Sequence, residues 1–171
     1  MKKIILLACF ILTIPLFAKP LITVFSDDNT YLEIPSAIDA YCSSLEEHGY
    51  KVSLFADSWS DPEAIRSVLK QVAESEDIEG AVFIGDIPVP MIQDAQHLTS
   101  AFKIDQRRDS DLTRISVASD RFYDDLDLVF DFIGQDEDNP LLFYYSLSET
   151  SPQYVEKDFY SGRIFPPVHD D

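Results

Sequence analysis

The chain has 171 residues, of which 46% are hydrophobic and 12% aromatic, a composition that excludes an intrinsically disordered protein. With 31 Asp and Glu residues against 13 Lys and Arg, its formal net charge is −18 at pH 7. A charge of this sign and size repels nucleic acid and anionic membranes, so we expect neither as a partner. Most of the charge is expected to lie on a solvated surface.

The first 18 residues have the pattern of a secretory signal peptide. Two lysines precede an almost wholly apolar stretch over residues 4–17, and Ala18 offers a small residue for cleavage. The apolar stretch is too short to span a bilayer comfortably, which favours a cleaved signal. We therefore predict a signal peptide over 1–18, a secreted or periplasmic product, and a single α/β domain over 19–171.

The next part of the chain predicts a strand, a helix and a second strand. Residues 21–25 and 51–55 are short apolar runs rich in β-branched and aromatic residues, as in buried strands. Between them, apolar residues recur at helical spacing from Pro35 onward. Gly49 supplies a left-handed end for this helix.

A second helix and a third strand follow. Asp61 suits a helix N-cap, and the residues after it form an apolar stripe at helical spacing, made of Ile65, Val68, Leu69 and Val72. Residues 80–84 are apolar on both faces. Because helical crossovers join apolar strands in parallel sheets, we predict a parallel sheet with helices on both faces, an αβα sandwich.

Beyond Pro90 the periodicity weakens. We expect residues 91–118 to form a loop with a short helix. The segment 120–138 is acidic and aromatic and predicts no clear element. Residues 141–147 and 158–164 are expected to form two further strands.

Acidic residues follow each of the first three predicted strands. Asp27 and Asp28 follow the first, Asp57 the second and Asp86 the third. Because the carboxyl ends of parallel strands meet at one edge of a sheet, these carboxylates could converge on a divalent cation. Aspartate also caps helices and turns in such positions, and we favour capping.

The densest acidic run suggests a calcium site, and calcium is the one cofactor that the sequence predicts. A calcium ion would be held by Asp120, Asp124, Asp125 and Asp127, with Asp131 nearby. The spacing lacks the central glycine and terminal glutamate of an EF-hand loop. A solvated acidic loop is therefore the alternative that we favour.

Residues for nucleophilic catalysis are scarce. His48 suits the end of a helix, His97 lies in a polar stretch, and His169 stands near the last residue of the sequence. Cys42 is expected on the apolar side of a helix among acids, which raise the pKa of a thiol. Because the zinc, phosphate-loop and serine-hydrolase motifs are absent as well, we predict no catalytic residue and no cofactor other than calcium.

Three segments, taken together, resemble a known family. A strand ends in Gly-Asp-Ile-Pro at 85–88, residues 119–127 read Ser-Asp-Arg-Phe-Tyr-Asp-Asp-Leu-Asp, and Gly-Arg-Ile follows at 162–164. This order resembles the amino-terminal half of the gingipain-like cysteine peptidases, over about residues 20–167. The resemblance implies a caspase-like parallel αβα sandwich. It also implies structural roles, a buried Arg–Asp pair among them, for the matched residues Asp86, Asp120, Tyr123 and Arg163.

In that family the catalytic histidine and cysteine follow the Gly-Arg-Ile strand, in a second half that this sequence does not include. Cys42, His48 and His97 do not occupy the family's catalytic positions. The acidic stretch 134–139 replaces a tryptophan and glycines of the family, which puts in doubt any metal role of this loop.

These observations predict an exported, non-catalytic or truncated gingipain-like peptidase homologue that lacks the catalytic His/Cys half. Its partner would be a protein or peptide, or the missing second subdomain, and after removal of residues 1–18 no membrane is expected. The alternative is an exported acidic protein that binds a divalent cation or a basic peptide. A sheet edge left open after the Gly-Arg-Ile strand also predicts self-association.

Overall fold

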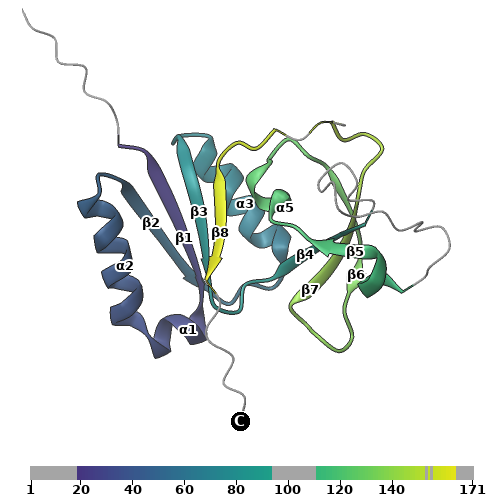
Figure 1. Cartoon of the computed structure of the whole chain (residues 1–171), viewed down its shortest axis with the longest axis horizontal. Helices are drawn as coiled ribbons and strands as arrows, with labels where there is room; N and C mark the ends of the chain where they lie inside the picture. Colours follow the sequence, from purple (N-terminus) through teal and green to yellow (C-terminus); the bar gives the residue numbers. More distant parts are fainter. Residues whose placement is uncertain (1–18, 94–110, 153, 155, 165–171) are drawn as a thin grey trace, which may run out of the picture.

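The computed structural model describes residues 19–93, 111–152, 154 and 156–164. These residues form two four-stranded sheets, called A and B here, with helices packed beside them (Figure 1). The elements follow one another as β1 (Leu21–Asp27), α1 (Asp28–Glu33), α2 (Pro35–Glu47), β2 (Lys51–Asp57), α3 (Pro62–Ala73), β3 (Ile78–Ile84), β4 (Val89–Gln93), α4 (Leu112–Ile115), β5 (Ser116–Ala118), α5 (Arg121–Asp124), β6 (Phe130–Gln135), β7 (Leu142–Leu147) and β8 (Tyr160–Ile164).

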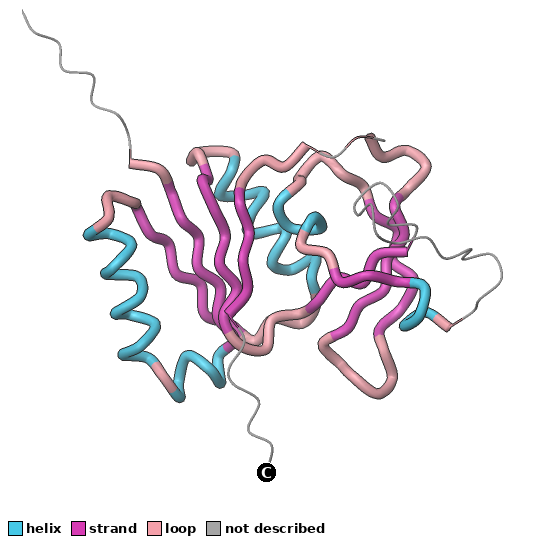
Figure 2. The backbone as a smooth tube through the Cα atoms, in the orientation of Figure 1, coloured by secondary structure: helices cyan, strands magenta, loops and turns pink. Residues whose placement is uncertain are grey.

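Sheet A is entirely parallel, and its strands lie in the order β2-β1-β3-β8 (Figure 2). The connection from β1 to β2 runs through α1 and α2, and the connection from β2 to β3 runs through α3. Helices α2 and α3 cover opposite faces of the sheet, because each packs on a different one of the two hydrophobic clusters. The predicted fold class, an α/β protein with a parallel sheet and helices on both faces, is confirmed.

Helix α2 covers one face through a single buried side chain and its partly buried neighbours. Ile38 packs with Val24 of β1 and Ile84 of β3 in the smaller cluster. Pro35 stands in the first turn, where its missing N–H leaves no donor unpaired. Past the end of the helix, Gly49 has φ +97°, the left-handed conformation that the sequence predicts there.

Helix α3 covers the other face and begins as the sequence predicts. The carboxylate of Asp61 accepts a hydrogen bond from the backbone N–H of Ala64 at 2.9 Å, which makes it the N-cap. Ile65 and Leu69 are fully buried and join Phe25 of β1 in the larger cluster. Each such burial contributes on the order of 1.5–3 kcal/mol to folding.

Sheet B is mixed, in the order β5-β4-β7-β6, and the sequence did not predict it. Strand β4 pairs in parallel with β7, whereas the β4–β5 and β6–β7 pairs are antiparallel. The expectation of a loop is wrong for residues 91–93 and 116–118, which are strands, while the expected short helix exists as α4. The rest of that predicted loop, 94–110, lies outside the described residues. Strands this short show no periodicity, and the partner of β4 is β7, far along the chain.

The last two predicted strands are confirmed as β7 and β8. One hydrophobic cluster contains residues of both sheets, and an aromatic chain connects them. The rings of Phe83 in β3 and Tyr123 in α5 lie 4.7 Å apart, and those of Phe122 and Tyr145 lie 4.5 Å apart. Helix α5 therefore fills the space between the two sheets. Among the described residues, no helix has the length and apolar character to cross a membrane.

Candidate functional site

The segment that leaves β3 makes a sharp turn at the carboxyl edge of sheet A. Gly85 has φ +84°, a conformation that side chains other than glycine rarely adopt. A Cβ at this position would collide with the carboxylate of Asp27 and the hydroxyl of Thr30. Glycine is therefore required here both by its backbone conformation and by the close approach of β1.

Asp27 holds this turn from the end of β1. Its Oδ1 accepts a hydrogen bond from the N–H of Thr30 at 2.9 Å and so caps α1, and its Oδ2 accepts one from the N–H of Asp86 at 2.8 Å. Burial raises the pKa of Asp27, but hydrogen bonds from Thr30, Asp86 and Asn29 outweigh it and hold the pKa below its ordinary value. The capping role that the sequence favours is confirmed for this residue.

The other strand-end acids do not converge with Asp27 on a common point. Ser58 donates a hydrogen bond from its hydroxyl to Asp28 at 2.8 Å and one from its backbone N–H to Asp57 at 2.8 Å. The side chain of Asp86 is exposed, and only its backbone N–H takes part in the turn. Asp28 and Asp57 therefore hold the segment that follows β2, in line with the capping that we favour, whereas Asp86 takes part through its backbone and not its side chain.

Arg163 of β8 binds the same turn through its guanidinium group. Its Nε donates to both carboxylate oxygens of Asp120, at 2.8 and 3.1 Å. Its Nη1 donates to the carbonyl oxygen of Ile87 at 3.0 Å, and its Nη2 donates to that of Pro88 at 2.9 Å. The guanidinium also lies over two aromatic rings, 5.2 Å from the centroid of Phe83 and 5.7 Å from that of Tyr123. The side chains are 11% exposed for Arg163 and 24% for Asp120.

Tyr123 completes this arrangement from α5. Its hydroxyl donates to the carbonyl oxygen of Pro88 at 2.8 Å, so that carbonyl accepts from both Tyr123 and Arg163. Tyr123 is fully buried, and burial raises its pKa well above the ordinary value although the charge of Arg163 opposes the shift. We call Arg163, Asp120, Tyr123 and the carbonyls of Ile87 and Pro88 the Arg163 clasp. The Arg–Asp pair expected from the resemblance is present here, although it is partly rather than fully buried.

The acidic run predicted to hold calcium is divided among separate partners. Asp124 is buried and accepts from Nη1 of Arg121 at 2.8 Å and from the hydroxyl of Ser161. Asp125 is buried and accepts from the N–H of Glu156 at 3.1 Å, while Asp127 is exposed. Burial raises the pKa of both Asp124 and Asp125.

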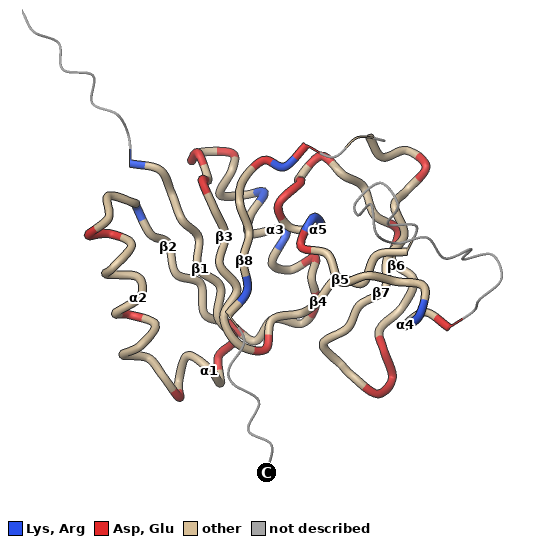
Figure 3. Tube along the Cα trace, in the orientation of Figure 1, with Lys and Arg blue, Asp and Glu red and all other residues tan. Residues whose placement is uncertain are grey.

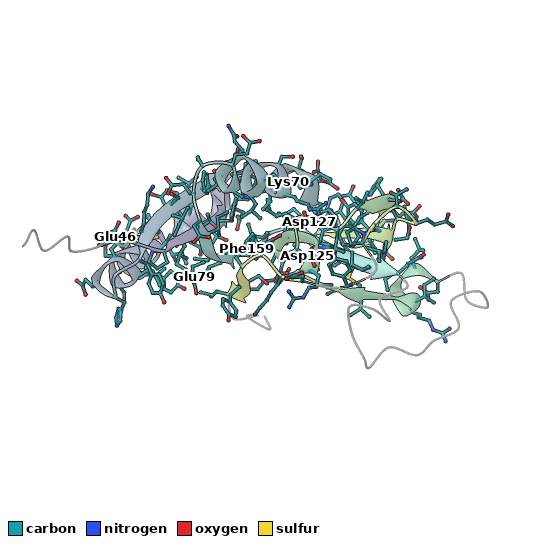
Figure 4. All side chains as sticks on the ribbon, turned by 90° about the horizontal axis from the view of Figure 1, so that it is seen from above. Glu46, Lys70, Glu79, Asp125, Asp127 and Phe159 are labelled. Carbon is teal, nitrogen blue, oxygen red and sulfur yellow. The ribbon has the colours of Figure 1, made fainter. Side chains whose placement is uncertain are left out.

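Asp127 lies near enough to Lys70 of α3 for its charge to raise the pKa of that lysine, against the larger effect of burial (Figure 4), and Figure 3 shows acidic residues spread over most loops rather than gathered at one place. Within the described ranges, no group of three or more His, Cys, Asp or Glu side chains is placed to hold a metal ion. The calcium site stays a prediction to which the structure adds no support.

The described candidates for nucleophilic chemistry lie away from the clasp. Cys42 is half-buried on α2, where burial, together with the charges of Asp39 and Glu46, raises the pKa of its thiol, as the sequence predicts. His48 caps the end of α2, with its Nδ1 2.7 Å from the carbonyl oxygen of Ser44. His97 and His169 lie outside the described residues.

Sequence reasoning missed one buried charged side chain, Arg66 of α3. Its Nη2 donates to the carbonyl oxygens of Asp125, Leu126 and Leu128, and its guanidinium lies 5.1 Å from the ring centroid of Phe122. Burial lowers its pKa. The only sequence signal is its position next to Ile65 in the apolar stripe. Arg66 ties α3 to the acidic segment.

Comparison with known proteins does not assign the chain to a family. No family model matches the chain, and no curated protein matches it. Among solved structures, the chain is similar to the crystal structure of the protein CinA, of unknown function, from Thermoplasma acidophilum. The identity is 12% and the TM-score 0.35, and the match covers 75% of this chain and 88% of that chain. A similarity at this level carries no argument about function.

Proposed function

We propose that this chain is an exported, non-catalytic homologue of the first subdomain of gingipain-like cysteine peptidases, and that it acts by binding a protein partner. The observation that carries the proposal is the Arg163 clasp. The three segments on which the resemblance rests meet there, although they lie far apart in the sequence. If the similarity of the three segments to the family were accidental, the matched residues would not be expected to contact one another.

The contacts of the clasp support a structural role for the matched residues. Arg163 and Tyr123 direct their donors to backbone carbonyls and to Asp120, so their polar groups have protein partners. A nucleophile needs a base within hydrogen-bonding reach and an environment that stabilises its anion. Cys42 has the opposite environment, since burial and acids raise its pKa.

Export is supported by the sequence of residues 1–18. N-terminal sequencing of the protein recovered from the cell envelope or the medium should begin at Lys19. Recovery from the cytoplasm with Met1 in place would overturn the export part of the proposal. The intact mass of the same sample shows whether further chain follows residue 171, in which case the catalytic half would lie there.

A peptidase assay tests the non-catalytic part. The purified chain is incubated with a mixed library of fluorogenic peptides, before and after alkylation of its thiols. We expect no turnover above that of a Cys42→Ser control. Turnover that is lost both on alkylation and in Cys42→Ser would show that Cys42 is a nucleophile and would overturn the proposal.

A further inference from the structure

Strand β8 is an edge strand of sheet A in the described part of the chain, and unlike the edge strands β2 and β6 it contains no acidic residue. In the described sheets, the edge strand β2 contains Asp57 and the edge strand β6 contains Asp131. Charged residues on an edge strand discourage pairing with another chain. Strand β8 reads Tyr-Ser-Gly-Arg-Ile, and its one charge, on Arg163, is neutralised by Asp120. Among β2, β6 and β8, β8 is thus the edge strand without an acidic residue of its own, which reduces the repulsion between two copies of a chain of net charge −18.

The backbone of β8 offers hydrogen-bonding groups on its outer side. The N–H of Gly85 donates to the carbonyl of Ile164 at 3.1 Å, so the backbone groups of Ile164 point toward β3. Because these groups alternate in direction along a strand, those of Gly162 and Tyr160 also point toward β3. Those of Ser161 and Arg163 point away from it, and no described strand lies beyond.

The side chains of β8 alternate between the two faces of sheet A. Ser161 and Arg163 face α5, where they bond to Asp124 and Asp120. These two hydrogen bonds connect β8 to α5 and to its N-cap Asp120. On the other face, Tyr160 is 62% and Ile164 45% exposed, although both are large and apolar.

An apolar groove of about 440 Å³ runs along this exposed face. Strands β3 and β8 supply most of its lining, and no residue of α2 lines it; the lining residues are Ile22, Tyr50, Glu79, Gly80, Ala81, Val82, Tyr160, Ser161 and Gly162. Figure 4 shows Glu79 on the side of the sheet away from α3. Because β8, the last described strand of sheet A, lines this groove, a strand added beside it would extend the groove.

We propose that β8 pairs with β8 of a second copy, antiparallel and about a twofold axis at Gly162. In this register the outward backbone groups of Ser161 meet those of Arg163 of the second copy, which makes both contacts hydrogen-bonded pairs by symmetry. Tyr160 then lies opposite Ile164 of the second copy, and an aromatic residue opposite a β-branched one is a stabilising cross-strand pair. The two grooves join into one across the axis.

Gly162 is suited to the twofold axis. In the proposed dimer, Gly162 of one copy lies opposite Gly162 of the other. The two form a non-hydrogen-bonded pair, in which Cα atoms approach to about 4.5 Å. A Cβ built on Gly162 meets no atom of the described residues within 4 Å, which leaves room for the second copy. This inference goes beyond the proposed function and holds whether or not the chain is a peptidase homologue.

Disulfide trapping tests the register. Gly162→Cys, with both native cysteines replaced (Cys9→Ser, Cys42→Ser), should form a covalent dimer when oxidised glutathione is supplied, since the Cα separation lies in the range of a disulfide. Gly134→Cys in the same background is the matched control, because Gly134 also lies in an edge strand with nothing within 4 Å of its Cβ. Several-fold more dimer from Gly162→Cys supports the proposal, and equal or lower yield overturns it.

Sedimentation of the unmodified protein gives an independent measurement. Salt shortens the Debye length from about 10 Å at 0.1 M to about 3 Å at 1 M, so the dimer should strengthen with salt. Ile164→Asp and Tyr160→Lys should each be monomeric, whereas their equimolar mixture should form a heterodimer with one Lys–Asp pair and one native pair. A wild-type protein that stays monomeric at high salt and high concentration overturns the proposal, as does a mixture that stays monomeric while the wild type dimerises.

Discussion

Asp27 accepts a hydrogen bond from the backbone N–H of Asp86 across the carboxyl edge of sheet A, at 2.8 Å. The same carboxylate caps α1 through the N–H of Thr30. One side chain at the end of β1 therefore fixes both the helix that follows it and the turn that follows β3. Two acids that the sequence marks as equivalent have different roles, since Asp27 contributes its side chain and Asp86 its backbone.

Replacing Asp27 should destabilise the protein in a pH-dependent way. Asp27→Ala removes an N-cap and leaves the N–H of Asp86 without its acceptor, so the free energy of unfolding at pH 7 should fall by about 1–3 kcal/mol. Because the folded-state pKa lies below the ordinary 3.8, this stabilisation is present above pH 3.8 and is lost as the pH falls through the folded-state value.

Chemical denaturation of wild type and Asp27→Ala at several pH values measures this difference. The exposed Asp57, which accepts one hydrogen bond from Ser58, serves as a control, and Asp57→Ala should change the stability by less than about 0.5 kcal/mol. A difference between wild type and Asp27→Ala that is the same at pH 2 and pH 7 would contradict the assigned role.

Two glycines with positive φ should respond differently to alanine. Gly85→Ala forces a Cβ into Asp27 and Thr30, so we expect a loss of more than about 2 kcal/mol or failure to fold. Gly49→Ala meets no atom within 4 Å and should lose about 1 kcal/mol, from backbone strain alone. Urea denaturation of the two variants gives the comparison, and equal losses would show that the close approach of Asp27 is unimportant.

The Arg163 clasp should be energetically coupled. Arg163→Lys keeps the charge but cannot direct a planar fork at Asp120 and two carbonyls, so we expect a loss of about 2–4 kcal/mol. In a double-mutant cycle with Asp120→Asn, the coupling energy should be about 1–3 kcal/mol. Additive losses would mean that Arg163 and Asp120 act separately.

Asp125 is expected to destabilise the folded chain at neutral pH. Its pKa is raised by burial and by the charges of Asp158, Asp124 and Asp127. Asp125→Asn keeps an oxygen for the N–H of Glu156 and removes the buried charge, so the melting temperature at pH 7 should rise. The gain should shrink as the pH falls from the raised folded-state pKa toward 3.8, because the wild-type carboxyl then binds its own proton. A constant gain over this range would point to packing instead.

Calcium should leave the thermal stability unchanged. Asp120, Asp124 and Asp125 already accept hydrogen bonds from Arg163, from Arg121 and from the N–H of Glu156, respectively. A ligand selective for the folded state would raise the melting temperature with its concentration. Thermal unfolding with calcium up to millimolar levels, against magnesium at equal ionic strength, decides the question. A saturating rise specific to calcium would restore the predicted site at Asp120 to Asp127.

The parallel sheet could be predicted because its signals are local. Asp61 before a proline and the stripe from Ile65 to Val72 define α3 without any knowledge of its partners. The central strands β1 and β3 carry largely apolar runs because both of their faces are covered. Sheet B has short strands and pairs such as Met91 with Tyr144, which no local pattern reveals.

The Arg163 clasp could be predicted from the sequence only in part. The resemblance pointed to Asp120, Tyr123 and Arg163 as structural residues, but the two carbonyls that they bind could not be read from side-chain types. The burial of Arg66 could not be predicted either, since its partners are the carbonyls of a loop about 60 residues away in the sequence. Side-chain identity predicts which residues bear charge, whereas backbone acceptors depend on tertiary structure.

The contact between Arg163 and Pro88 joins residues 75 positions apart, and it has a consequence for the order of folding. Strands β1, β2 and β3, with the helices between them, precede Pro88 in the chain and can form as soon as they are synthesised. The turn at 85–88 stays without its guanidinium partner until β8 is made and docks beside β3. Because contacts of large sequence separation form slowly, we expect β8 to dock late, and its docking both adds the last described strand to sheet A and holds the turn that leads into sheet B.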